Sequence, residues 1–157
     1  MVISGLTENA NRIKNANFIS AGSGIAGLIT DFAEEVNEKG ITYTFSGVEL
    51  KGLASKRIIM PPDGSAYLTY TNQSPEYVMA NLIASQLINS SAERKFNGSI
   101  ADFTEGTDKI TFNGRFDALD EVLSNLAETY AVGWYADITV DGNIVWHIYH
   151  GVNRSIE

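Results

Sequence analysis

An apolar stripe at helical spacing runs through residues 115–130, RFDALDEVLSNLAETY, and constrains the fold more than any other feature of the chain. Its members lie three or four positions apart, on one face of an α-helix: Phe116, Leu119, Val122, Leu123, Leu126, Ala127 and Tyr130. Asp117, Asp120 and Glu121 stand near its start, where the helix dipole favours negative charge. The pattern predicts an amphipathic helix, which needs an apolar surface to pack on.

The segment that follows is typical of such a surface. On the outward strand Trp134, Ala136, Ile138 and Val140 alternate with Tyr135, Asp137 and Thr139, and on the return strand Ile144, Trp146 and Ile148 alternate with Val145, His147 and Tyr149. Asp141-Gly142 between the two strands favours a tight hairpin turn. We expect the Trp/Ile face of this hairpin to cover the helix.

A second helix is predicted after Ser74-Pro75, because serine caps a helix and proline is tolerated at its first position. Its apolar side holds Val78, Leu82, Ile83 and Leu87, and Asn89-Ser90-Ser91 ends it. ITYTFSGVEL (41–50) alternates like a half-buried strand, and FNGSIADF (96–103) and KITFNG (109–114) favour short strands. Pro61-Pro62-Asp63-Gly64 predicts a loop, and residues 1–17 predict a flexible lead-in.

Composition excludes several kinds of function. The 157 residues carry a formal net charge of −8, which argues against nucleic acid as the main partner. Because the chain has no cysteine, disulfides, thiolate nucleophiles and cysteine-ligated metals are ruled out. No apolar run approaches the about 20 residues of a membrane helix, and the N-terminus resembles no secretory signal, so we expect neither membrane insertion nor a signal peptide.

The motif Gly22-x-Gly24-x-x-Gly27 raises the alternative of a dinucleotide-dependent oxidoreductase. Such a fold needs a strand, the glycines and then a helix, and the apolar residues after the motif do recur at helical spacing: Ile25, Leu28, Ile29, Phe32 and Val36. The acid that should follow the second strand and bind the ribose is missing, since Phe45, Ser46 and Gly47 stand there. A lone match of this kind is weak evidence, and a glycine-rich turn is the competing interpretation.

The remaining candidate sites are weaker. His147 and His150 lie three apart on a predicted strand, so they should point to opposite faces and cannot share one metal. Asp102, Glu105 and Asp108 lack the spacing of a calcium loop. The hairpin aromatics, namely Trp134, Tyr135, Trp146 and Tyr149, could stack on a sugar, which leaves a carbohydrate-binding module as another alternative. We therefore expect no catalytic, cofactor-binding or metal-binding residue.

Three segments in order resemble the tail-tip (baseplate hub, or tail-associated) proteins of long-tailed phages and prophages of Gram-positive bacteria. The segments are SGVELKGLASKRIIMPP, SPEYVMANLIASQLINSSAERKF and RFDALDEVLSNLAETYAVGWYADITVDGNIVWHIYHGVNRS. The matching positions are Gly47, Leu50, Leu53, Arg57, Pro61, Pro62, Pro75, Val78, Met79, Arg115, Leu119, Leu123, Ala127, Gly133, Trp134, Gly151, Arg154 and Ser155. The chain departs from the pattern at Asn153, where the family usually has aspartate.

The resemblance implies a structural protein without an active site. It implies an α+β fold, with a β-rich partial barrel or sheet over residues 18–72 and, over 73–157, an insert of two helices on a small antiparallel sheet. It also implies a hairpin that turns at Asn37 to Gly40, so that the glycine motif precedes a strand rather than a helix. The implied partners are the tail tube or distal tail protein and a tail fibre or receptor-binding protein, in a homotrimeric tail tip of the virion.

Overall fold

The computed structural model describes residues 2–4, 18–20, 26–38, 40–90 and 95–151. The fold is α+β, as predicted. The chain forms two compact units, Met1–Leu50 and Lys51–Glu157. The predicted boundary at residue 72 falls within the second unit, and the predicted lead-in of residues 1–17 includes a short strand, β1 (Val2–Ser4). The rest of that lead-in, residue 1 and residues 5–17, lies outside the described residues.

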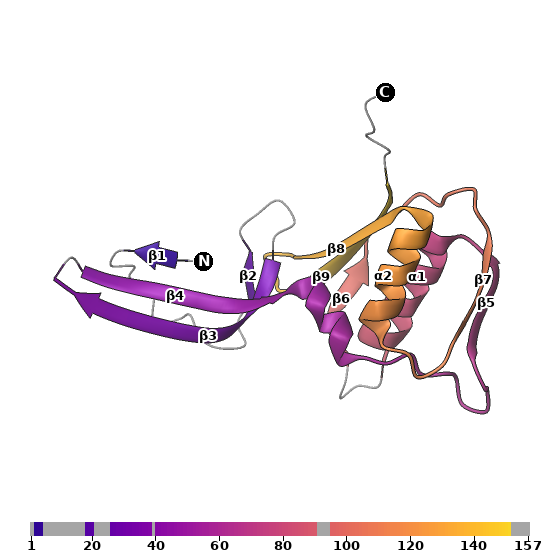
Figure 1. The fold of residues 1–157 in the computed structure, drawn as a ribbon, viewed down its shortest axis with the longest axis horizontal. Helices are drawn as coiled ribbons and strands as arrows, with labels where there is room; N and C mark the ends of the chain where they lie inside the picture. The colour runs from indigo at the N-terminus through magenta and orange to yellow at the C-terminus, as the bar shows by residue number, and fades with distance from the viewer. Residues whose placement is uncertain (1, 5–17, 21–25, 39, 91–94, 152–157) are drawn as a thin grey trace, which may run out of the picture. The chain divides into compact units, whose positions relative to one another are not determined.

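The first unit is an open antiparallel sheet of four strands, in the order β1-β4-β3-β2. Besides β1, its strands are β2 (Phe18–Ser20), β3 (Ala26–Asn37) and β4 (Gly40–Glu49). The long strands β3 and β4 form a hairpin that turns between Asn37 and Gly40 (Figure 1), as the family resemblance implied. The register shifts between Ile29 and Asp31, which marks a β-bulge in β3.

Strand β3 corrects the helical interpretation of the glycine motif. A dinucleotide fold requires a helix after the glycines, whereas Ala26–Asn37 is a strand that pairs with β2 and β4 in antiparallel directions. The spacing that suggested a helix is satisfied by a strand with a bulge, because the bulge moves Ile29 and Phe32 to one face. Gly22 and Gly24 lie outside the described residues, and Gly27 is part of β3.

The second unit holds two α-helices and two small sheets. Its elements are η2 (Leu50–Lys56, which begins at the last residue of the first unit), β5 (Leu68–Gln73), α1 (Pro75–Ile83), η3 (Ala84–Ile88), β6 (Gly98–Ile100), β7 (Ile110–Gly114), α2 (Leu119–Tyr130), β8 (Val132–Ile138) and β9 (Ile144–His150). Strands β5 and β7 pair with each other, and β6, β9 and β8 form the other sheet. That sheet is mixed rather than wholly antiparallel as predicted, because β6 runs parallel to β9.

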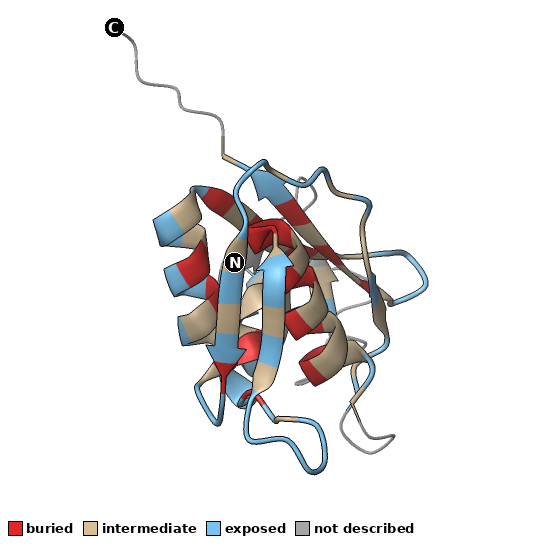
Figure 2. Cartoon of the chain, turned by 90° about the vertical axis from the view of Figure 1, so that its right-hand side faces the viewer, coloured by how far each residue is buried: buried red, intermediate tan, exposed pale blue. Residues whose placement is uncertain are grey.

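The core of this unit lies where the helices meet the sheets. Helix α1 buries Val78, Leu82 and Ile83, and Leu87 continues the same side in η3, as the sequence predicts. Helix α1 contacts β9 and helix α2 contacts β8. Buried and exposed positions alternate along the elements (Figure 2), which is the pattern expected of surfaces with one face in the core.

Helix α2 begins later than its apolar pattern predicts. Residues 115–118 are not helical, and Phe116 has a φ of 58° and is 53% exposed. Instead this segment bonds to the chain after η2: the Phe116 N–H donates to the Ile59 carbonyl at 2.8 Å, and the Ile59 N–H donates to the Asp117 carbonyl at 2.9 Å. The Arg57 carbonyl accepts the Leu119 N–H at 3.0 Å, so backbone from a distant segment satisfies the start of the helix.

The β8–β9 hairpin packs as predicted on its inner face. Trp134 and Trp146 are buried, with ring centroids 6.1 Å apart, beside the buried Ile144 and Ile148. Strand β8 ends at Ile138, so Val140 is fully exposed and does not extend the inner face as the alternation suggested. Within the part of the chain that the structure describes, no helix is long and apolar enough to cross a membrane.

Candidate functional site

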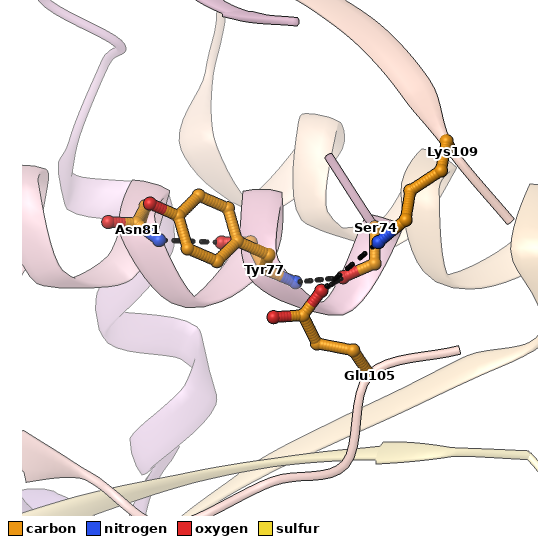
Figure 3. Close-up of polar contacts among 5 residues, drawn as sticks. All are labelled: Ser74, Tyr77, Asn81, Glu105 and Lys109. Atoms are coloured by element: carbon orange, nitrogen blue, oxygen red, sulfur yellow. Dashed lines mark hydrogen bonds and ion pairs between the residues drawn. The ribbon is translucent and has the colours of Figure 1, made fainter. Parts of the chain in front are cut away.

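A polar cluster surrounds the N-terminal end of α1. Ser74 caps the helix: its hydroxyl oxygen accepts the Tyr77 N–H at 3.1 Å, and its O–H donates to Glu105 Oε2 at 2.8 Å (Figure 3). Lys109 Nζ lies 3.4 Å from the same Glu105 oxygen, and both of these side chains are well exposed. The cap therefore ties the helix to the loop that connects β6 with β7.

Glu76 in the first turn of α1 is a buried carboxylate. It is 1% exposed, and its Oε1 lies 2.9 Å from Nδ1 of His150, the last residue of β9. Gly106 closes the cluster, because a Cβ there would lie 3.0 Å from Glu76 Oε1 and 3.4 Å from His150 Nδ1. A side chain at position 106 would displace one of these two groups.

The environment of Glu76 favours its charged form. Burial raises the pKa of the Glu76 carboxyl, but a hydrogen bond from His150 and backbone hydrogen bonds at Glu76 and Gly106 outweigh that effect. The net pKa lies below the ordinary value of 4.5. The N-terminal end of a helix also favours a negative charge.

This cluster joins segments of the protein rather than exposing a reactive group. Glu76 is held by His150, and Glu105 is held by Ser74 and Lys109. The Ser74 hydroxyl is buried and is engaged as the cap of α1. Within the described residues, no group of three or more histidine and acidic side chains could hold a metal ion, and Asp102, Glu105 and Asp108 form no such group. His150 borders a shallow groove of about 470 Å³, lined also by Asp102, Phe103, Thr104, Ile148 and Tyr149.

The outer face of the β8–β9 hairpin carries a second aromatic group. The rings of Tyr135 and His147 stack with centroids 4.5 Å apart, and Tyr149, which is half exposed, covers Gly133. His147 and His150 do lie on opposite faces, as predicted. Because Trp134 and Trp146 are buried, a sugar-binding platform built on them is contradicted.

A third feature is an apolar face on the β3–β4 hairpin, which we call the arm face. It consists of Phe32, Glu34, Val36, Ile41, Tyr43 and Phe45, which pair across the two strands and lie on one side of them. Phe32 contacts both Tyr43 and Phe45, with ring centroids 5.7 and 5.3 Å apart. The opposite side is polar and holds Asp31, Ala33, Glu35, Thr42, Thr44 and Ser46.

Two of these features could hardly be predicted from the sequence. Glu76 and His150 are 74 positions apart, and no spacing rule links a carboxylate in a helix cap to the end of a distant strand. The link between Ser74 and Glu105 was equally hidden, although the capping role of Ser74 was predicted. One strand of the arm face was visible as alternation in residues 41–45, whereas residues 25–36 also fitted a helical period, so only the family resemblance implied the second strand.

The described residues thus form an α+β protein whose polar clusters join its own segments and whose hairpin presents an apolar face. The chain belongs to the family of siphovirus ReqiPepy6 Gp37-like proteins, whose family model matches residues 3–157. This match confirms the resemblance to phage tail proteins that the sequence motifs predicted.

Two solved structures are similar to the chain. One is the E. coli c3393 protein, a component of the type VI secretion system described as structurally similar to T4 bacteriophage tail proteins gp27 and gp5. Its sequence is 10% identical to this chain, and the TM-score is 0.47. The match covers 84% of this chain and 35% of that chain. The other is the 43 kDa tail protein of prophage MuSo2 from Shewanella oneidensis, 17% identical with a TM-score of 0.41 over 93% of this chain and 42% of that chain.

This chain spans less than half the length of either protein. Both TM-scores are below 0.5, so neither likeness supports an argument about function. No curated protein sequence matches the chain.

Proposed function

We propose that this protein is a structural component of the tail tip of a long-tailed phage or prophage and acts by assembly rather than catalysis. The observation that carries the proposal is the family match, which extends over residues 3–157 and so includes both units. A role in assembly agrees with the geometry of the described residues, in which the polar clusters join segments of one chain and an apolar face is left on the hairpin of the first unit.

The proposal extends to the place of the protein in the particle. It is hub-like and trimeric, lies at the distal end of the tail tube, and contacts the tube or distal tail protein on one side and a fibre or receptor-binding protein on the other. A closed trimer repeats one heterologous contact, in which one patch of each copy meets a different patch of the next copy. Burial of apolar surface at those contacts supplies the affinity.

Quantitative mass spectrometry of purified particles tests this proposal. Peptides of this chain are compared with peptides of the major tail tube protein, using isotope-labelled standards for both. We expect the chain in intact particles at a low copy number that is a multiple of three. Particles with normal tails that lack the chain would overturn the structural role, and a copy number that is not a multiple of three would overturn the trimer alone.

A further inference from the structure

We propose that the arm face is a docking surface for a different tail protein, one that presents an apolar patch with lysine or arginine side chains around it. This inference rests on the proposed role in tail assembly and names the chemistry of the partner surface. Of the residues that define the arm face, Phe45 is buried, so the accessible part of the face consists of Phe32, Glu34, Val36, Ile41 and Tyr43.

The first support is exposure. Phe32 is 38% exposed and lies beside the rings of Tyr43 and Phe45. Val36 is 69% exposed and pairs with the half-buried Ile41, so neither is an isolated apolar residue. In the part of the chain that the structure describes, the first unit contains strands and no α-helix that could cover a sheet face. Contiguous exposed apolar surface with a polar surround is characteristic of a protein interaction site.

The second support is the two-sided pattern of β3 and β4. A hairpin with one apolar face and one polar face is the pattern of a sheet that packs on another layer. The polar side, with Asp31, Glu35 and Thr44 among its members, faces water. The exposed part of the apolar side therefore offers a surface for a second layer, which a single sheet does not itself supply.

Charge decides between a second copy of this chain and another protein. Residues 26–49 contain five acidic side chains and one basic side chain: Asp31, Glu34, Glu35, Glu38 and Glu49 against Lys39. Glu34 lies within the arm face, between Phe32 and Val36. Two copies packed face to face would bury Glu34 of each copy without a cation and would bring two acidic hairpins together, which is costly.

A partner with basic side chains removes both penalties. A lysine or arginine opposite Glu34 would give that carboxylate a charged hydrogen bond, and further basic groups at the rim would speed encounter with the acidic hairpin. The apolar residues around Glu34 would exclude water from the pair and supply most of the affinity.

The test uses the full-length chain and the other proteins encoded in the same tail gene cluster, each purified and measured for binding one at a time by surface plasmon resonance. Val36→Ser and Glu34→Lys change the arm face at exposed positions. Ala33→Ser and Glu35→Lys are the matched controls, since they make comparable changes on the opposite side of the same strand. Circular dichroism checks that each variant keeps the wild-type fold.

We expect one tail protein to bind, about tenfold more weakly to Val36→Ser and to Glu34→Lys than to wild type, through faster dissociation. The two controls should keep nearly wild-type dissociation rates, and wild-type association should slow as salt is raised from about 0.05 M to about 0.5 M.

Two results would overturn the inference alone: a tail protein that binds all four variants equally, or a dimer of this chain in light scattering that Val36→Ser abolishes. Failure of every tail protein to bind would overturn both the inference and the proposed role in assembly.

Discussion

Glu76 lies in the first turn of α1, and its carboxylate contacts two segments that are distant in the sequence. His150 approaches it from the end of β9, and Gly106 approaches it from the loop before β7. A carboxylate held in this way stabilises the fold in its charged form, because its hydrogen bond with His150 would weaken on protonation. We expect Glu76→Gln to reduce the free energy of unfolding by about 1–2 kcal/mol at neutral pH, measured by urea denaturation. Glu121→Gln, at an exposed position in the first turn of α2, is the matched control and should change it little.

The same carboxylate gives the protein an acid-sensitive contribution to stability. Because the folded-state pKa of Glu76 is below its ordinary value of 4.5, this contribution is fully present above about pH 4.5 and disappears as the pH falls through the folded-state pKa. The difference in unfolding free energy between wild type and Glu76→Gln should therefore shrink on acidification. A difference that stays constant, or grows, between neutral pH and pH 3 would contradict this account of Glu76.

Gly47 occupies a position where the backbone of β3 leaves no room for a side chain. A Cβ at Gly47 would lie 2.2 Å from the Leu28 carbonyl oxygen, opposite the bulge in β3. We expect Gly47→Ala to force the two strands apart and to destabilise the sheet by at least about 1–3 kcal/mol. Limited proteolysis should then cleave the first unit faster than in wild type. Gly64→Ala, in an open loop of the second unit with a φ of 80°, is a control that should leave the first unit protected.

At the scale of elements, the packing of α2 is stabilised by the side chains that it buries on its inner face. Leu123 is fully buried and contributes to the face that packs toward β8. We expect Leu123→Ala to cost about 2–5 kcal/mol, because it removes buried methyl groups and leaves a cavity. The exposed neighbour Asn125→Ala should cost less than about 0.5 kcal/mol. Equal unfolding midpoints for the two variants would show that α2 does not pack as described.

The elements also show what local pattern can and cannot predict. The apolar stripe from Leu119 to Leu126 was long and regular, so the sequence correctly predicted a helix there. Its predicted first turn is not helical, because backbone hydrogen bonds to residues 57–59 hold Phe116 in a left-handed conformation. In residues 26–37 the helical and strand periods competed, and pairing with β4 decided the outcome. Pairing between distant segments of this kind is a tertiary effect that a short window of sequence does not contain.

At the scale of the whole molecule, we expect the two compact units to differ in what stabilises them, so that the second unit can fold without the first. The second unit has its own buried core, including Trp146, Leu82 and Leu123, and η2 contributes Leu53 and Ala54. We expect a fragment of residues 50–157 to fold alone, with the same thermal midpoint as the second unit in the full chain. A fragment of residues 57–157, which lacks η2, should be less stable. An unfolded 50–157 fragment in circular dichroism would contradict this division.

Immunogold electron microscopy of particles from the source phage or prophage, labelled with antibody to this chain, tests whether the protein lies at the tail tip. The protein belongs to a siphovirus family, and its proposed place is the distal end of the tail. We expect gold at that end in most intact particles and none along the tube. Well-formed tails without label at the tip, with antibody that recognises the native protein in solution, would contradict this placement.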